Sequence, residues 1–485
     1  MKSPSSSSSS KRRPSSGHRN NNNNASIAVW EENTMAILDS SGIKDSRDVH
    51  DDRLCFLEAV RSASLASESP SAPSWRIFDA IFQILTDCNS LELAMASYQL
   101  LIELDKHYPR VYLSKSDELE SSSSDISKLV VVKEAWSPFN LASGSEEGAA
   151  KDSCYLFDPL RFSNLIDDMA QAVKNLDFDF AVKPIQNSLV FQYLVNVLEV
   201  DLLLRLNLYK ETLNWSLLRE SVMNLLLGSR KLNFKSVVRD CMSILLRRCH
   251  HSISNNVQQL RNSENTCCSQ SDENSKAAVA IAISQLEKET CVSIQKFVGL
   301  VIELDVVRKE ADSLGQTSRV DGLRLPITEF IVEELTYNKD NFAPLLLVFS
   351  EPKWKLEIIL LYFSKYLIKP SVRTRRSNDT PVDVTLESVL SNFSTTASTK
   401  NIVKKVSSDL ASLLLAHAFQ ACLSLIRGPR QITNPTELIG ANLLEICSKL
   451  ISAIKIIRRV DGKLEITSFT KEALFTAAMI LKTNA

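Results

Sequence analysis

The sequence predicts an all-α protein, built as an irregular α-solenoid of stacked helical pairs. Glycine is scarce, with 11 residues among 485, or about 2% against roughly 7% in an average protein. Sheets, barrels and nucleotide-binding folds need more residues of positive φ for their tight turns. Apolar residues also recur three or four positions apart along most of the chain, which is the spacing of one helix face.

The clearest pattern is a pair of helices between residues 74 and 109. The first helix has Ser74 as its expected N-cap, and the second runs from Ser90 until Pro109 ends it. The expected apolar face of the first helix comprises Trp75, Phe78, Phe82 and Leu85. Because the link between the two helices is short, the pair is expected to form an antiparallel hairpin.

Helical spacing continues through most of the remaining chain. Stripes wider than one face, as in residues 190–208, predict helices that are contacted on two sides, as in armadillo and HEAT repeats. Trp215 and Trp354 lie within such stripes and are predicted core anchors. The stripe at 277–311 also suits a partner helix in a coiled coil, although a core position is favoured. Further helices are expected at 54–66, 159–175, 187–209, 211–227, 234–250, 277–311, 326–337, 352–368, 400–426, 436–459 and 470–482.

Polar stretches define the expected domain organisation. Residues 1–26 are rich in Ser and Asn, carry five basic and no acidic side chains, and are expected to be a disordered tail. Residues 27–485 are expected to form a single α-solenoid domain. Surface loops are expected where the apolar pattern stops, near 114–128, 140–153, 252–276 and 371–399.

Composition indicates a soluble, intracellular protein. The formal net charge is −1 and the isoelectric point about 6.6, so the chain as a whole does not attract nucleic acid. No signal sequence or membrane span is expected, and ten cysteines are too few for a disulfide scaffold. Most cysteines are expected to be reduced and buried in helices. A zinc site is the alternative for one group of cysteines and histidines, although their spacing suits structural zinc poorly: Cys241, Cys249, His250, His251, Cys267 and Cys268.

No sequence pattern predicts catalysis. The chain lacks G-x-x-x-x-G-K-[ST], G-x-G-x-x-G, G-x-S-x-G and H-E-x-x-H, and it has only six histidines. His417 falls on an apolar helix face, where a hydrogen-bonded core histidine is expected. We therefore expect no enzyme activity, no catalytic or metal-binding residues, no cofactor and no small-molecule substrate.

Two basic clusters are candidate sites. The first has the form of a nuclear-import signal and comprises Lys11, Arg12 and Arg13. The second follows the helix stop at Pro370 and comprises Arg373, Arg375 and Arg376. This second cluster suits a phosphate or an acidic protein partner, and a solvated loop is the alternative. It lacks the interleaved aromatic residues that stack on single-stranded nucleic acid.

Several strings, in order between about Trp30 and Ala485, resemble a plant family of negative regulators of systemic acquired resistance. Examples are KEAWSPFN at 133–140, ETLNWSLL at 211–218, PKWKLEI at 352–358 and VRTRR at 372–376. The resemblance implies an armadillo-like fold, a nuclear location and repression of pathogenesis-related defence genes. It further implies membership, as a non-SMC element, of the Smc-five/Smc-six complex, which acts in DNA-damage response and recombination.

Two functions are therefore open. The first is a nuclear scaffold subunit that binds proteins, namely another non-SMC element and SMC subunits, with only indirect or weak DNA contact and no membrane contact. The alternative is a direct DNA-binding transcriptional repressor that uses the loop at residues 373–376. The near-neutral charge of the chain favours the scaffold.

The basic loop gives a first testable prediction. Changing Arg373, Arg375 and Arg376 together to Glu should release protein partners in co-precipitation, because the three guanidinium groups would no longer meet carboxylates or phosphates. Folding should be nearly intact, since exposed charge changes usually alter stability by no more than about 0.5 kcal/mol each. Retention of every partner by the folded triple variant would leave the cluster as a solvated loop.

Overall fold

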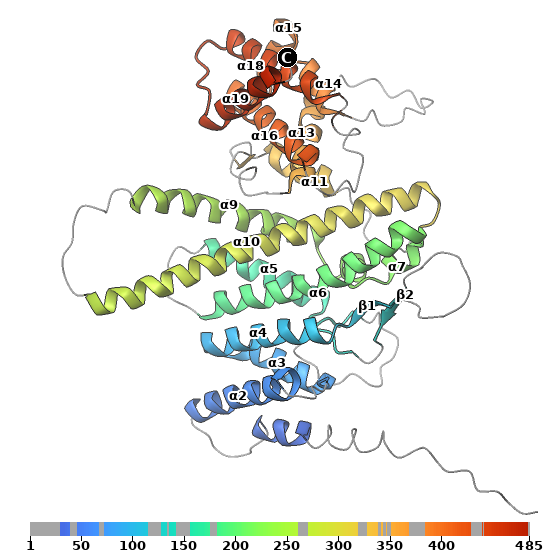
Figure 1. Ribbon diagram of the computed structural model, residues 1–485, viewed down its shortest axis with the longest axis vertical. Coiled ribbons are helices and arrows are strands. Elements are labelled where there is room, and N and C mark those ends of the chain that lie inside the picture. The colour runs from blue at the N-terminus through green and yellow to red at the C-terminus, as the bar shows by residue number, and fades with distance from the viewer. Residues whose placement is uncertain are drawn as a thin grey trace, which may run out of the picture. The chain divides into compact units, whose positions relative to one another are not determined.

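The structure is a computed structural model, shown in Figure 1. Within the part of the chain that it describes, regular structure is almost entirely helical and includes one two-stranded sheet, so the all-α prediction is confirmed. The described residues are 30–38, 46–66, 72–114, 128–132, 135–141, 156–174, 182–259, 270–318, 327–337, 341–342, 346, 351–367, 384–427, 439 and 441–483.

Contacts divide the chain into two compact units, whereas the sequence predicts a single domain. Unit 1 comprises residues 1–112 and 130–138, and unit 2 comprises residues 113–129 and 139–485. The division falls beside the predicted polar loop near 114–128, where the described chain on either side pairs as strands β1 (Val111–Ser114) and β2 (Lys128–Val131). The predicted tail at 1–26 lies outside the described residues.

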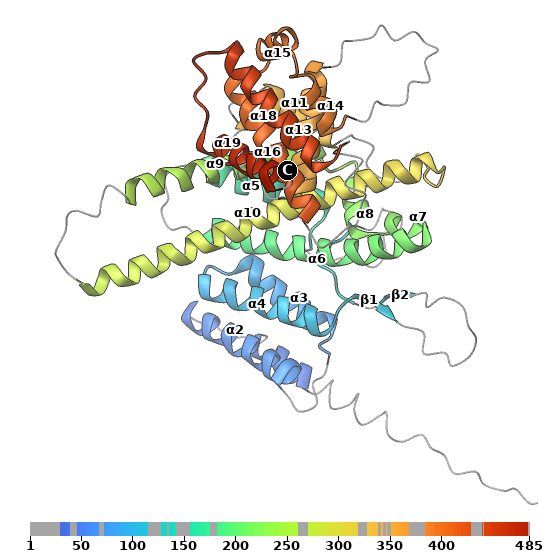
Figure 2. The ribbon, with the colours of Figure 1, turned by 45° about the horizontal axis from the view of Figure 1, so that its top comes forward.

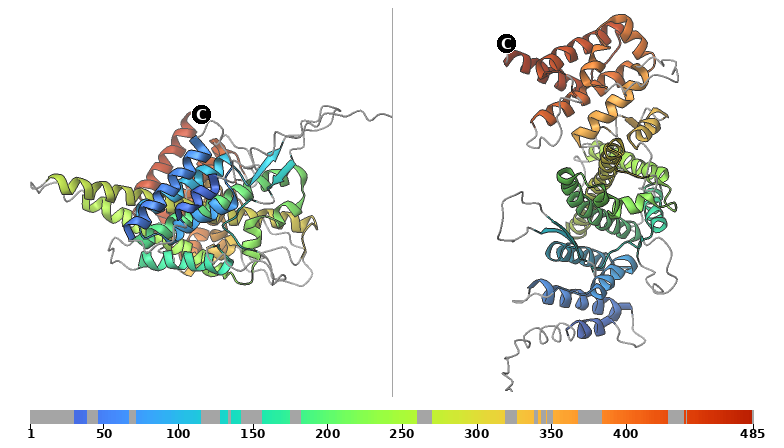
Figure 3. Two further views of the ribbon diagram at one scale, coloured as in Figure 1. Left: turned by 90° about the horizontal axis from the view of Figure 1, so that it is seen from below. Right: turned by 90° about the vertical axis from the view of Figure 1, so that its right-hand side faces the viewer.

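Unit 1 is built from helices that pack on their neighbours in sequence, drawn in blue in Figure 3. After a helix at residues 30–38, its elements are α2 (Ser46–Arg61), the π-helix η1 (Ser62–Ala66), α3 (Trp75–Asp87) and α4 (Leu91–His107). Helices α3 and α4 form the predicted hairpin, and Ser90 caps α4 by accepting a hydrogen bond from the amide of Leu93.

One tryptophan closes the core of unit 1 and another lies outside it. The ring of Trp136 stacks on Phe78 and meets Phe82 edge-on, and its Nε1 donates to Asp79 Oδ1 at 3.1 Å. Trp75, by contrast, is 55% exposed, so its predicted place on the buried face of α3 is wrong. Trp75 is the first residue of α3, and no helical turn precedes it to receive its side chain.

The helices of unit 2 pack in layers, and several of the strongest contacts join helices that other helices separate in sequence. Helix α10 lies along α6 (Figure 2), α13 packs on α11 and α16, and α18 packs on α14, α15, α16 and α19. The elements are α5 (Pro159–Lys174), α6 (Val182–Thr212), α7 (Trp215–Arg219), α8 (Val222–Gly228), α9 (Phe234–Gln259), α10 (Gln270–Ser313), α11 (Ile327–Tyr337), α13 (Pro352–Leu367), α14 (Leu386–Ser391), α15 (Thr396–Val403), α16 (Ser408–Arg427), α18 (Leu443–Val460) and α19 (Ser468–Thr483).

A triangle of phenylalanines joins the first helices of unit 2. Phe162 of α5, Phe191 of α6 and Phe297 of α10 have ring centroids 5.5 to 6.3 Å apart, and all three are fully buried. Such aromatic pairs stabilise a core beyond the area that they bury. Helix α6 is buried on two sides, as its wide apolar stripe predicts, and α10 takes a core position from Thr290 onward.

Two predicted loops are partly helical. In the stretch 252–276, α9 continues to Gln259 and α10 begins at Gln270. Polar residues without apolar spacing extend these helices, because adding a residue to an existing helix costs far less than starting one. In the stretch 371–399, α14 and the start of α15 form as short helices, and Thr385 and Thr395 cap them by accepting amide hydrogen bonds.

Helix α16 is long and apolar enough to cross a membrane by length and composition, although the sequence predicts no such span. In this protein 61% of its most apolar window is buried against other parts of the chain. Its apolar residues are used in packing against α13, α18 and α19.

Core burial gives a second prediction. Trp215 and Trp354 are 4% and 5% exposed, which confirms both as core residues. The indole of Trp354 packs beside Gly299 of α10, where a Cβ atom would lie 3.7 Å from its Nε1. Replacing either tryptophan with Ala should lower the free energy of unfolding by about 3–5 kcal/mol, because the cavity cannot fully collapse. Urea unfolding followed by circular dichroism measures this loss of stability. Trp75→Ala is the matched control and should change little, and an equal loss in all three variants would contradict the assignment.

Candidate functional site

The predicted basic sites lie outside the described residues. This applies to Arg373, Arg375 and Arg376 and equally to Lys11, Arg12 and Arg13. Of the cysteines considered for zinc, Cys241 is buried, and burial raises the pKa of its thiol well above the usual range. No group of three or more His, Cys, Asp or Glu side chains placed to hold a metal occurs within the described ranges.

Buried charges in unit 2 are paired in ways that position helices. Arg205 Nε donates to Asp201 Oδ1 at 2.8 Å within α6, and both side chains are almost fully buried. Arg205 also donates to the carbonyl of Leu217 in α7, while Asp201 accepts from the amide of Val222 in α8. Breaking such a pair leaves an uncompensated buried charge, so this cluster has a structural role.

A second charged cluster joins α6, α10 and α13. Glu303 lies 3.5 Å from Lys353 Nζ and 3.8 Å from Lys210 Nζ, so one carboxylate meets a cation from each neighbouring helix. Burial raises the pKa of Glu357 nearby, and the charge of Lys353 opposes this rise. Because these charges are taken up by contacts within the chain, the cluster offers little for a ligand.

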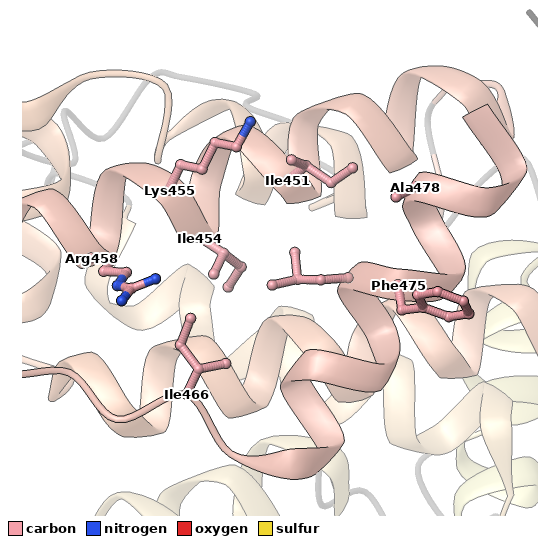
Figure 4. Close-up of a pocket in the computed structure, with 8 residues that line it drawn as sticks. Ile451, Ile454, Lys455, Arg458, Ile466, Phe475 and Ala478 are labelled. Atoms are coloured by element: carbon pink, nitrogen blue, oxygen red, sulfur yellow. The ribbon is translucent and has the colours of Figure 1, made fainter. Parts of the chain in front are cut away.

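An apolar pocket lies between α18 and α19, and Figure 4 shows it. Its volume is about 360 Å³. Helix α18 contributes residues at the i, i+3, i+4 and i+7 positions of one flank, α19 contributes the facing flank, and the link between the helices closes one end. The lining residues are Ile451, Ile454, Lys455, Arg458, Ile466, Leu474, Phe475 and Ala478, and we call this surface the α18–α19 groove.

The outer part of the groove lies on a flank that the described contacts with earlier helices leave open. Lys449 of α18 forms a 2.7 Å ion pair with a glutamate of α14, and Arg458 follows nine residues later. On α19, the ring of Phe469 stacks on His417 of α16, and the groove residue Ala478 lies nine residues after Phe469. Nine residues are about two and a half helical turns, so Arg458 and Ala478 lie opposite these two contacts. Ile454, by contrast, is 2% exposed and belongs to the buried stripe of α18, so the groove extends from the packed core to the surface.

The α19 side of the groove carries an exposed aromatic residue. Phe475 is 67% exposed and Met479 43%, whereas the buried stripe of α19 consists of small residues. A helix face in a solenoid is normally polar where no other helix of the described chain packs on it. An apolar groove with an exposed ring at that position is typical of a protein-binding surface.

A buried histidine supports the other flank of α19. His417 of α16 stacks on Phe469 with ring centroids 4.0 Å apart, and its Nε2 has no hydrogen-bond partner in the described structure. Burial, with a smaller contribution from the charge of Lys355, lowers the pKa of His417 to about 4. The prediction of a core histidine is confirmed, but the hydrogen bond expected at Nε2 is absent from the described contacts.

Sequence reasoning identified the two helices but none of the groove residues as functional. Helical spacing alone places Phe475 among the many apolar residues of α19. Phe475 lies off the buried stripe formed by Thr470, Ala473 and Ala477, but which stripe is buried depends on the neighbouring helices, so spacing alone carried no signal for it.

Comparisons with known proteins place the groove in a family context. The SNI1 middle domain matches residues 110–351, and the SNI1 C-terminal domain, which contains the groove, matches residues 367–485. The protein "Negative regulator of systemic acquired resistance SNI1" of Arabidopsis thaliana is 40% identical over 460 residues, covering 94% of this chain and 95% of its own length. No solved structure gives a significant match.

The buried histidine gives a third prediction, on pH dependence. The folded protein keeps His417 neutral down to about pH 4, whereas the unfolded chain binds a proton near pH 6.5. Stability should therefore fall as the pH drops from 6.5 toward 4, by about 3 kcal/mol from this residue. The variant His417→Phe should show a shallower decline in melting temperature over this range. Phe469→Leu keeps the imidazole and should keep the steeper decline, and parallel declines in both variants would contradict the prediction.

Proposed function

Because this chain belongs to the SNI1 family, whose relative in Arabidopsis is a negative regulator of systemic acquired resistance, we propose that it is a nuclear protein-binding scaffold that restrains plant defence-gene expression. Within this proposal it acts as a non-SMC element of the Smc-five/Smc-six chromosome-maintenance complex, in DNA-damage response and homologous recombination. Its partners are another non-SMC element and SMC subunits. The proposal assigns it no catalytic activity.

The observation that carries the scaffold assignment is the α18–α19 groove. The exposed Phe475 borders an apolar pocket between α18 and α19, and a side chain of a partner can pack there. The charged clusters of the described core, by contrast, are used to join helices. A surface of this kind supports binding to protein rather than chemistry on a small molecule.

A co-precipitation experiment from plant nuclei tests the scaffold. Phe475→Asp should reduce recovery of Smc-five/Smc-six subunits about tenfold, because it places a charge in the apolar contact. Folding should be retained, since the side chain is largely exposed. Leu225→Asp is the matched control, as Leu225 is 48% exposed on α8, away from the groove. Undiminished recovery with Phe475→Asp would contradict the assignment.

Direct DNA binding through the loop at 373–376 is the alternative function, and salt dependence separates the two. A protein with several phosphate contacts binds duplex DNA tightly at about 50 mM salt and loses most of that affinity by about 200 mM. The scaffold, with a net charge of −1, should bind weakly at both concentrations. Nanomolar binding by the purified full chain at physiological salt would favour the repressor.

A further inference from the structure

The rim of the α18–α19 groove is strongly basic. Lys455 and Arg458 line it from α18 (Figure 4). On α19, Lys471 precedes Ala478 by seven residues and Lys482 follows it by four, so both share the flank of Ala478. All four side chains are exposed, and none forms an ion pair within the described ranges.

Few acidic side chains offset these charges. Glu472 is next to Lys471 in sequence but lies about 100° further around α19, and Glu465 stands beside Ile466 at the closed end. Asp461 follows Arg458 by three residues, and its Oδ1 accepts a hydrogen bond from the amide of Lys463. The rim therefore has four cations around an apolar floor. Elsewhere in unit 2 the interhelical cations meet carboxylates, as Lys449 meets Glu387 and Lys296 meets Glu199, both within 2.8 Å.

The shape of the groove suits a helix. A cavity of about 150 Å³ accepts a molecule the size of benzene, so 360 Å³ accommodates two large apolar side chains. The lining of α18 repeats at one-turn intervals through Ile451, Ile454 and Arg458, which matches the spacing of side chains along a docked helix. A helix in this place would make the contact that the next pair makes elsewhere in the stack.

We propose that the α18–α19 groove binds an amphipathic helix of a protein partner, whose apolar row fills the floor and whose Asp or Glu side chains face Lys455, Arg458, Lys471 and Lys482. This inference rests on the proposed function and specifies the chemistry of the partner segment. Charge complementarity selects an acidic segment, because a basic helix would place like charges together at the rim. Nucleic acid fits less well, since phosphate contacts leave the apolar floor and Phe475 unused.

A pair of matched peptides tests this inference with the purified full chain. Both peptides are amphipathic helices of about 18 residues, or five turns, with the same leucine row. One has Glu beside the row and the other has Lys. In fluorescence anisotropy at about 150 mM salt the Glu peptide should bind at least about tenfold more tightly than the Lys peptide.

Variants locate the binding and reverse its charge preference. Phe475→Asp should weaken the Glu peptide about tenfold or more, while the control Leu225→Asp should leave its affinity unchanged. The double variant Lys455→Glu with Arg458→Glu should bind the Lys peptide more tightly than the Glu peptide, which a partly unfolded protein would not do.

Three outcomes would overturn the inference. These are equal affinity for both peptides, no binding of either, and displacement of the Glu peptide by duplex DNA or by anionic phospholipid vesicles at lower concentration than by unlabelled peptide. The proposed function is tested separately by recovery of complex subunits from nuclei. Loss of recovery with Phe475→Asp, together with equal peptide affinities, would keep the scaffold and reject the acidic helix.

Discussion

The organisation of this protein depends on one constraint: a helix in a stack has to bury apolar side chains against the helix before it and the helix after it. Helices α6, α10, α13 and α16 meet this constraint on several sides, through contacts such as the Phe162, Phe191 and Phe297 triangle. Within the part of the chain that the structure describes, α18 packs on α14, α15, α16 and α19, and the apolar groove between α18 and α19 stays open.

Charge is distributed according to the same constraint. Inside the stack, charged side chains pair across or within helices, as Asp201 does with Arg205, because an unpaired charge in low dielectric is costly. At the terminal pair, the cations around the groove have no such partner in the described chain. The contrast separates charges that hold helices together from charges available to another molecule.

Much of the fold could be predicted from helical spacing, but the groove could not. The apolar period located α3, α5 and α13 closely, and the width of the stripe at 190–208 indicated a helix buried on two sides. Helices in polar stretches, such as the extension of α9 to Gln259, lack the period that prediction uses. Trp75 and Phe475 were not distinguished from core residues, because exposure depends on which neighbour is present and spacing does not report it.

Site-specific photo-crosslinking at position 475 tests the central claim, that the terminal helix pair carries the partner surface. A photoreactive phenylalanine analogue replaces Phe475 in the full chain, and a second protein carries it in place of Leu225 on α8. Irradiated nuclei should give a covalent adduct from position 475 with a Smc-five/Smc-six subunit, and none from position 225. Identical adducts from both positions, or none from position 475 while the complex is still co-precipitated, would contradict the account.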